Sequence, residues 1–393
     1  MSDDGSDKRT VAALTTPPGS GGIAVIEVRG ARAREIVSRV FTPKSQTGWL
    51  YGPPDRLHYG HVRDGDDVVD EVLVRVASDD AGAEMLEVNG HGGIVAAGET
   101  MRLLVDAGAV EVTPAELIER SADDAGLDKL QAEAMRLLPL AKTRLAARVI
   151  ADQLDGALSR AVRSVDPASP AAPDILDALA RSAAFGAALT RPRRLVLVGS
   201  PNAGKSTLFN ALVGHSRTIV SPTPGTTRDF INEVIAVGGY PVELVDTAGL
   251  RRHGDVVEMR GVEATWGVVS DADLVVIVAD GTRPMTPAER ELLDALSAAE
   301  PILALNKCDV GPADPAWKLA ACAAVCEISA LRGEGLRLLT RTILERFPDS
   351  GAYPPGCAVA LNRAQAEALQ SAREHCVRGH ASAAATALAG MMA

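Results

Sequence analysis

The sequence predicts a chain of three parts: an α+β domain, a helical domain, and an α/β domain with a mostly parallel sheet inserted into the helical one. The 393 residues are enough for two or three domains of about 150 residues each. Short apolar segments alternate with amphipathic ones in the second half, and helical periodicity flanks them on both sides. With 47% hydrophobic and 23% charged residues, the composition excludes a disordered, collagen-like or low-complexity protein.

We expect the α+β domain to span residues 10–119. Strand-like segments (GIAVIEVRG and VVDEVLVRVA) alternate there with helix-like ones (ARAREIVSRVF and ETMRLLVDAG), and NGHGG at residues 89–93 is typical of a turn. The helical domain is expected in two pieces. Residues 120–190 carry Leu, Ala, Met and Val at helical spacing around a Pro-rich gap, and the Ala-rich residues 357–393 are expected to pack back on them.

The α/β domain is expected at residues 191–347. Its strand-like segments are wholly apolar and alternate with amphipathic helices: RLVLVG, VELVD, DLVVIVAD, PILALN and AVCEIS. Continuous apolar strands are typical of a sheet that is buried on both faces, which in turn is typical of parallel strands joined by helices.

Charge and residue spacing exclude several classes of protein. The 40 basic and 51 acidic residues give a net charge of −11, so any contact with RNA must be focal. The five cysteines and seven histidines lack the spacing of a disulfide framework or a metal site. The N-terminus is polar, and the longest apolar runs, such as LVVIVA at residues 274–279, are too short to span a bilayer. We therefore expect a cytoplasmic protein without a membrane contact.

Residues 199–206 (GSPNAGKS) match the GxxxxGK[ST] pattern of a phosphate-binding loop, and they stand between an apolar strand and a helix-like segment. In such a loop the backbone N–H groups face the phosphates, and the helix N-terminus adds the positive end of its dipole. Lys205 is expected to reach the β- and γ-phosphate oxygens, and the Ser206 hydroxyl is expected to bind Mg²⁺.

Three further motifs follow later strands. In DTAG (residues 246–249), we expect Asp246 to hold Mg²⁺ through water and the Gly249 amide to sense the γ-phosphate. In NKCD (residues 306–309), the Asp309 carboxylate can accept hydrogen bonds from the ring N–H and exocyclic amine of guanine, a donor pair that adenine lacks. ISA at residues 328–330 fits a loop whose backbone amide meets the guanine carbonyl. The predicted nucleotide is GTP.

With these motifs the chain resembles the translation-factor-like GTPases, which implies a P-loop GTPase fold for the α/β domain. Residues 221–229 (SPTPGTTRD) resemble the first switch of these proteins, with Thr227 as an Mg²⁺ ligand. The expected GTP-binding residues come from these five motifs: Asn202, Ala203, Gly204, Lys205, Ser206, Thr207, Ser221, Thr226, Thr227, Asp246, Thr247, Ala248, Gly249, Asn306, Lys307, Asp309, Ser329 and Ala330.

The catalytic group cannot be the glutamine of Ras-like enzymes, because Leu250 follows DTAG. DTAGLR followed by VVEMRGVEATW resembles the MnmE (TrmE) family of tRNA-modification GTPases, in which a glutamate at the position of Glu258 orients the attacking water indirectly. The alternative interpretation is that Glu258 is a solvated carboxylate on a helix face without a catalytic role. PNAGKS and PGTTRD also resemble GTPases that use a bound K⁺. The ligands implied for K⁺ are Asn202, Ser221, Thr223 and Thr226.

The resemblance to the MnmE family covers nearly the whole chain, since TPPGSGGI (residues 16–23), NGHGG and PAELIER (residues 114–120) look like its N-terminal part. It implies a tetrahydrofolate-binding-like N-terminal domain that forms a homodimer, with Glu116 and Arg120 as candidate folate residues. It also implies that the chain, together with an MnmG-type FAD-dependent partner, modifies the wobble uridine (position 34) of tRNA.

The chain also departs from the family pattern. Ser20 stands where the family usually has Arg, and residues 80–84 and 124–126 differ from polar segments of the family, so binding of a tetrahydrofolate derivative is expected to be weak. The sequence ends in AGMMA, without the family's Cys-x-Gly-Lys motif. A second interpretation is therefore a divergent paralogue that acts as a GTP-dependent switch on RNA or ribosomes, without modification activity.

Overall fold

The computed structural model describes residues 9–17, 19, 21–45, 55–78, 84–215, 232–246, 269–319, 322, 324–348 and 353–393. They form two units, one that ends at Arg136 and one that begins at Leu137. Within the described residues, no helix combines the length and the apolar character needed to cross a bilayer.

The first unit is built on a seven-stranded sheet with the order β3-β4-β5-β6-β2-β1-β7. Neighbouring strands are antiparallel except β1 and β7, which are parallel. The elements are β1 (Val11–Leu14), β2 (Ile23–Arg29), α1 (Ala33–Val40), β3 (Phe41–Pro43), β4 (Leu57–Asp64), β5 (Asp67–Ser78), β6 (Glu84–His91), α2 (Ile94–Asp106), β7 (Val110–Glu111), α3 (Pro114–Asp124) and α4 (Lys129–Leu137).

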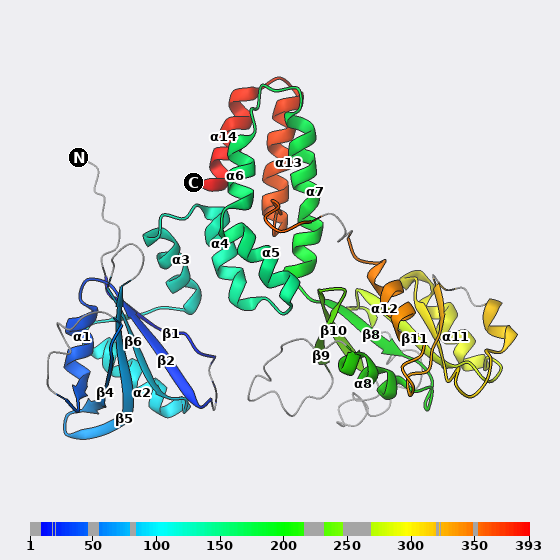
Figure 1. Cartoon of the computed structure of the whole chain (residues 1–393), viewed down its shortest axis with the longest axis horizontal. Coiled ribbons are helices and arrows are strands. Elements are labelled where there is room, and N and C mark those ends of the chain that lie inside the picture. The colour runs from blue at the N-terminus through cyan, green and yellow to red at the C-terminus, as the bar shows by residue number, and fades with distance from the viewer. Residues whose placement is uncertain are drawn as a thin grey trace. The chain divides into compact units, whose positions relative to one another are not determined.

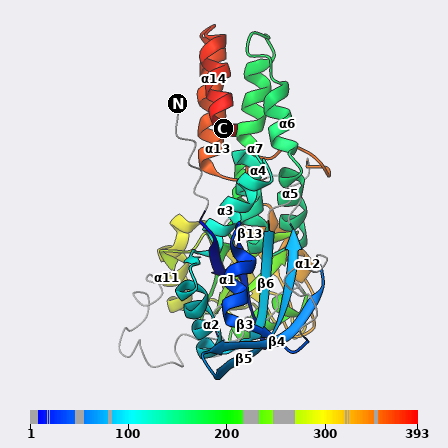
Figure 2. The same ribbon diagram turned by 90° about the vertical axis from the view of Figure 1, so that its left-hand side faces the viewer.

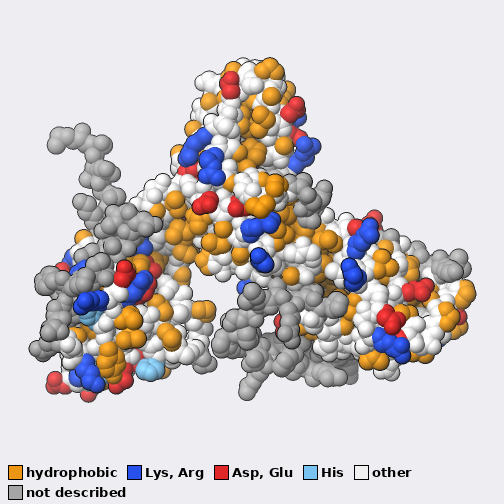
Figure 3. Space-filling model, in the orientation of Figure 1, with side chains coloured by type: hydrophobic (Ala, Val, Ile, Leu, Met, Phe, Trp, Pro, Cys, Tyr) orange, Lys and Arg blue, Asp and Glu red, His pale blue; other side chains and the backbone are white. Residues whose placement is uncertain are grey.

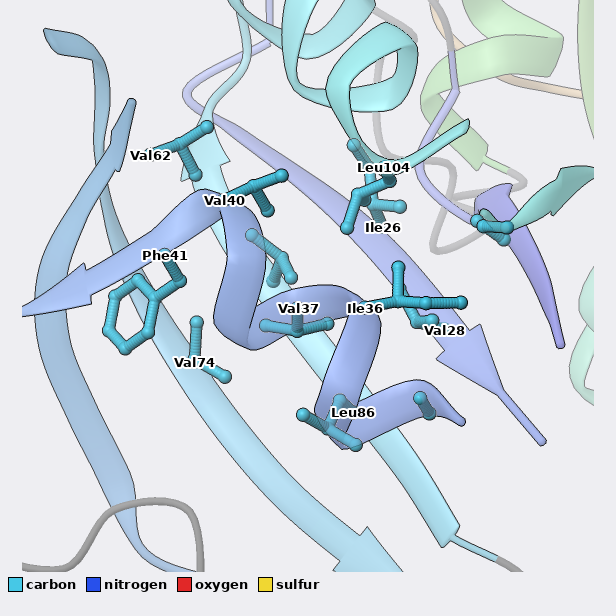
Figure 4. Close-up of a cluster of buried hydrophobic side chains, with 14 of the residues drawn as sticks. Ile26, Val28, Ile36, Val37, Val40, Phe41, Val62, Val74, Leu86 and Leu104 are labelled. Carbon is cyan, nitrogen blue, oxygen red and sulfur yellow. The ribbon is translucent and has the colours of Figure 1, made fainter. Parts of the chain in front are cut away.

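The core of this unit lies between one face of the sheet and the helices α1 and α2. Alternate residues of a strand point to the same face, so Val72 and Val74 of β5 are both buried there. Figure 4 shows Ile36, Val37 and Val40 of α1 gathered with the side chains of this sheet face. Helices on one face of a largely antiparallel sheet form the α+β architecture that the sequence predicts.

The turn predicted at residues 89–93 is wrong for its first three residues. Asn89, Gly90 and His91 end β6 and pair with β2, and only residues 92 and 93 separate the strand from α2. The buried Asp70 of β5 explains the difference. Its carboxylate accepts a hydrogen bond from the His91 amide at 2.8 Å, and its other oxygen lies 2.6 Å from His91 Nδ1. A tertiary contact thus outweighs the local preference of Asn and Gly for turns.

The second unit contains a sheet with the order β13-β12-β11-β8-β10-β9. Its elements are η2 (Leu138–Leu140), α5 (Arg144–Leu154), α6 (Ala157–Ser164), α7 (Ala172–Thr190), β8 (Arg193–Val198), α8 (Lys205–His215), β9 (Asn232–Val237), β10 (Tyr240–Asp246), β11 (Leu274–Asp280), α11 (Pro287–Leu296), η3 (Ser297–Ala299), β12 (Ile302–Asn306), η4 (Pro315–Leu319), β13 (Ala324–Glu327), α12 (Leu336–Leu344), α13 (Arg363–Val377) and α14 (Ala381–Met392).

The five apolar segments predicted as strands are the five parallel strands β8, β10, β11, β12 and β13, so the mostly parallel α/β sheet is confirmed. Every residue of β12 is buried, as expected for a strand covered on both faces. The sequence prediction missed β9, which pairs antiparallel with β10 at the edge of the sheet. Gly238 and Gly239 connect the two strands with φ of 59° and 93°, the left-handed conformation that a two-residue hairpin turn requires.

The helices that precede this sheet along the chain pack beside the helices that follow it. Figures 1 and 2 show α13 next to α7, and Figure 1 shows α14 beside α6. The Ala360 amide donates a hydrogen bond to Ser182 Oγ of α7 at 2.9 Å. Only glycine fits at residue 186 of α7, because a Cβ there would lie 2.1 Å from the Ala360 carbonyl oxygen. The chain that follows the sheet therefore packs on the helices that precede it.

Candidate functional site

The predicted phosphate-binding loop joins β8, an interior strand, to α8 (Figure 1). Glycine is required at both ends of this loop. Gly199 has φ of 148°, and a Cβ there would lie 2.1 Å from the Val278 carbonyl oxygen. Gly204 has φ of 97°, and its Cβ would lie 2.1 Å from Asn306 Nδ2. Asn202 is also left-handed, with φ of 63°. Such a succession of conformations suits a concave loop that turns its N–H groups towards an anion.

Lys205 begins α8 and is only 9% exposed. Its ammonium donates hydrogen bonds to the carbonyl oxygens of Gly199 and Ser200, both at 2.9 Å. These bonds hold the cation against the backbone of the loop, next to the N-terminus of α8, where the helix dipole is positive. A fixed positive charge beside backbone donors is an arrangement that binds phosphate.

Ser206 and Asp246 come together although 40 residues separate them in the chain. The Ser206 hydroxyl donates a hydrogen bond to Asp246 Oδ2 at 2.8 Å, and Asp246 is 6% exposed at the end of β10. The parallel pairing of β8 and β10 explains their meeting, since the carboxyl ends of both strands lie at one edge of the sheet. A hydroxyl beside a carboxylate supplies the hard oxygen ligands that Mg²⁺ prefers, so these two residues fit this ion.

Asn306, at the end of β12, joins two loops of the candidate site. Its Nδ2 donates a hydrogen bond to the Ala203 carbonyl at 2.8 Å, and its Oδ1 accepts one from the Ala330 amide at 2.9 Å. Ser329, the neighbour of Ala330, is fully buried. The side chain of Asn306 thus connects the phosphate-binding loop to the loop after β13, which the sequence analysis placed at the guanine carbonyl.

Lys307 contacts a residue that the sequence analysis missed. Its φ is 73°, and its ammonium lies 2.7 Å from Asp280 Oδ2, at the end of β11. Burial by itself would raise the pKa of Asp280, but hydrogen bonds from Lys307 and Thr282 outweigh it, so the pKa lies below its usual value. Asp280 is therefore a carboxylate that keeps Lys307 in place. Its signal in the sequence is an acidic residue at the end of a buried strand, as for Asp246.

Asp309 carries the carboxylate that the sequence assigned to guanine, and its side chain is 9% exposed. Arg332 Nε lies 3.6 Å from Asp309 Oδ2. Arg332 was not predicted as a site residue. No local pattern marks it, because its partner stands on a different loop.

Eight predicted site residues lie outside the described residues: Ser221, Thr223, Thr226, Thr227, Thr247, Ala248, Gly249 and Glu258. The described ones come from the ends of β8, β10, β12 and β13 and the loops that follow them. Hydrogen bonds join all four places: Ser206 links the loop after β8 to the end of β10, and Asn306 links the end of β12 to the loops after β8 and β13. The structure therefore brings the described nucleotide candidates together at the carboxyl edge of one sheet.

The folate candidates in the first unit have structural contacts. Glu116 is the third residue of α3, and one carboxylate oxygen accepts hydrogen bonds from the Thr113 amide at 2.7 Å and the Thr113 hydroxyl at 2.9 Å. These bonds lower the pKa of Glu116 and cap the helix. Arg120 Nη1 donates to the Arg9 carbonyl at 3.4 Å. A cavity of about 220 Å³ lies elsewhere in this unit, and Glu111 is the only charged residue among the described ones that line it.

Comparison with known proteins gives two family models and many relatives. The model "GTP-binding protein TrmE N-terminus" matches residues 10–123, and the model "50S ribosome-binding GTPase" matches residues 194–307. A tRNA modification GTPase MnmE from Heliobacterium modesticaldum is 35% identical, over 93% of this chain and 88% of its own. One from Chloroflexus aurantiacus is 34% identical, over 95% of this chain and 91% of its own.

Among solved structures, the G domain of the T. maritima FeoB iron transporter is 27% identical over 40% of this chain and 99% of its own, with a TM-score of 0.27. At that score the superposition supports no conclusion. The sequence identity to the MnmE proteins is above 30% and extends over most of both chains, with a separate match in each unit. The chain therefore belongs to the MnmE (TrmE) family of GTPases.

Proposed function

We propose that this chain hydrolyses GTP at the carboxyl edge of the second sheet, and that hydrolysis serves modification of the wobble uridine (position 34) of tRNA. The observation that carries the proposal is the joining of three motifs at that edge: Lys205 held on its loop, Ser206 bonded to Asp246, and Asn306 bonded to Ala203. The role in tRNA modification is supported by the relatives, whose names state it.

In this proposal the triphosphate lies on the loop of residues 199–206. Its backbone N–H groups and Lys205 bind the phosphates. Their part in catalysis is electrostatic, because positive groups at fixed positions stabilise the negative charge of the phosphates. The Asp309 carboxylate accepts hydrogen bonds from the ring N–H and the exocyclic amine of guanine. Asn306 holds the loop of Ser329 and Ala330 beside the base. Lys307, fixed by Asp280, precedes Asp309 by two residues in the same motif.

Ser206 and Thr227 of the first switch would bind Mg²⁺ directly, and Asp246 would hold it through water. When bound, Mg²⁺ neutralises charge that develops on the phosphate oxygens. The hydrogen bond of 2.8 Å between the Ser206 hydroxyl and the Asp246 carboxylate keeps both oxygens in place.

We propose that hydrolysis depends on K⁺, with Asn202, Ser221, Thr223 and Thr226 as ligands. Asn202 is exposed on the loop in a left-handed conformation. Turnover of GTP is expected to be about tenfold or more faster in KCl than in NaCl at equal ionic strength, because a cation beside the phosphates stabilises the transition state. Asn202→Ala should remove the difference. Asn210→Ala, an exposed asparagine of α8, is the matched control and should keep it. Equal rates of the unchanged protein in the two salts would contradict the proposal.

We propose that a tetrahydrofolate derivative binds weakly, because the described residues do not fit it. Folates carry carboxylates, whereas the described lining of the cavity in the first unit has an acidic side chain and no cation. Glu116, one of the two candidates, is occupied by the cap of α3. Titration calorimetry with 5-formyltetrahydrofolate is expected to give no measurable binding. Micromolar affinity would contradict this expectation and would return Arg120 to consideration.

We further propose the organisation of the chain around this site. Residues 10–119 form a tetrahydrofolate-binding-like domain that mediates a homodimer. Residues 120–190 and 357–393 form one helical domain, into which the GTPase domain of residues 191–347 is inserted. The packing of α13 on α7 supports this arrangement. The chain works in the cytoplasm with an MnmG-type FAD-dependent partner.

Contact with tRNA is proposed to be focal. On the face shown in Figure 3, the described Lys and Arg side chains are interspersed with Asp and Glu rather than gathered into a broad basic surface. The deciding experiment is mass spectrometry of wobble nucleosides from a strain that lacks this gene. The modified uridine should disappear and should return with the unchanged gene but not with Lys205→Ala. Unaltered nucleosides in the deletion strain would overturn the role in tRNA modification and leave the GTPase activity untouched.

A second candidate function is a GTP-dependent switch on RNA or ribosomes. It is favoured by the family model that matches residues 194–307, whose description names the 50S ribosome. The same deletion strain separates the two, since a switch of this kind would alter ribosome profiles and leave the wobble nucleosides unchanged.

A further inference from the structure

The ion pair between Arg332 and Asp309 joins an exposed cation to a nearly buried anion. Arg332 Nε lies 3.6 Å from Asp309 Oδ2, and the two side chains are 62% and 9% exposed. The guanidinium therefore lies on the solvent side of the carboxylate. This inference rests on the proposed function, in which Asp309 accepts the guanine donors.

The backbone beneath Arg332 is fixed by a tight turn between β13 and α12. The Arg332 amide donates to Ser329 Oγ at 3.1 Å, and the Gly333 amide donates to the Ser329 carbonyl at 2.8 Å. The Ser329 amide closes the turn on the Glu334 carbonyl at 2.9 Å. Because Ser329 is fully buried, this turn has little conformational freedom, and the backbone position of Arg332 is fixed.

The backbone that leads to Asp309 is fixed as well. The Cys308 amide donates to the Ile328 carbonyl at 3.1 Å, and the Lys307 ammonium is held by Asp280 at 2.7 Å. What remains adjustable is the rotation of the Asp309 side chain, which sets the plane of its carboxylate. That plane decides whether both oxygens can meet the two guanine donors at once.

The surroundings of Asp309 are acidic. Burial raises the pKa of the neighbouring Cys308 thiol, and the negative charges of Glu334, Asp309 and Glu327 raise it further. Asp309 therefore lies among other carboxylates. The positive charge of Arg332 offsets part of their negative charge.

We propose that Arg332 is a positioning residue for guanine recognition, which holds the Asp309 carboxylate in the plane that the base requires. A carboxylate has about four lone-pair sites on its two oxygens, so both oxygens can accept from guanine while the Arg332 charge, 3.6 Å from Oδ2, attracts the carboxylate. Arg332 acts through Asp309 and need not touch the nucleotide.

The first measurement is calorimetric titration with GDP. Arg332→Ala is expected to weaken GDP binding by about two- to fivefold, the range of an exposed ion pair. Arg332→Lys keeps a cation at this place and should recover at least half of the loss. The matched control is Arg341→Ala. Arg341 is an exposed residue of α12 that pairs with Glu345, the residue after this helix, at 3.3 Å. The Arg341→Ala variant should bind GDP as the unchanged protein does.

The second measurement separates positioning from a general effect on the loop. In an Asp309→Asn background, which should bind xanthosine diphosphate, Arg332→Ala is expected to leave xanthosine diphosphate affinity unchanged, because a neutral amide forms no ion pair. Unchanged GDP affinity in Arg332→Ala would overturn the inference, and so would an equal loss in both backgrounds. If Asp309→Asn by itself left GDP affinity unaltered, the proposed guanine site would fail, not only the role of Arg332.

Discussion

Replacing Asp309 with Asn is expected to weaken GDP binding by at least about tenfold and to create binding of xanthosine diphosphate. A hydrogen bond to a charged group contributes about 1.5–3 kcal/mol, and about 1.4 kcal/mol corresponds to a factor of ten in affinity. The amide of Asn keeps one acceptor but turns the other edge of the side chain into a donor. That donor opposes the exocyclic amine of guanine and suits the carbonyl that xanthine carries there.

Titration of the unchanged protein and of Asp309→Asn with GDP and with xanthosine diphosphate tests this expectation. Asp294→Asn is the matched control, because Asp294 is an exposed aspartate of α11 in the same domain and should alter neither affinity. Equal GDP affinity in Asp309→Asn and the unchanged protein would show that the base is recognised by other groups.

Replacing Glu258 with Ala is expected to slow GTP hydrolysis by at least about tenfold, and by up to about 10⁴, the range of a group that positions or deprotonates the attacking water. GTP affinity should hardly change, since it depends on the loop of residues 199–206 and on Asp309. The argument is positional: Leu250 has no polar group to orient water, and Glu258 stands where the family carries its glutamate. Glu258 itself lies outside the described residues.

Single-turnover kinetics together with GTP titration decide between three outcomes. A slow variant with normal affinity supports the catalytic role. Normal turnover would make Glu258 a solvated carboxylate on a helix face, and lost GTP binding would make it a structural residue. Glu291→Ala, an exposed glutamate of α11, should behave as the unchanged protein in both measurements.

The elements of the second sheet could be predicted from the sequence because their signals are local. A run such as ILAL of β12 is apolar at every position, and a run of this length between turn signals is typical of a strand buried on both faces. The phosphate-binding loop could also be predicted, since Gly199, Gly204 and Lys205 must stand at fixed spacing between a strand and a helix. Turn-type residues gave weaker signals. The first three residues of NGHGG form a strand instead of the expected turn, and the Gly238-Gly239 hairpin was not predicted.

Only the tertiary structure decided how the motifs act on one another. The sequence by itself predicted that Asn306, Ala203 and Ala330 belong to a nucleotide site, but their hydrogen bonds join positions 103 and 24 residues apart. The pairs of Lys307 with Asp280 and of Asp309 with Arg332 are likewise formed between loops. Local patterns report the neighbours of a residue along the chain, whereas these contacts depend on the order and register of parallel strands. Parallel pairing places the carboxyl ends of separate strands at one edge, and there the polar residues that end each strand meet.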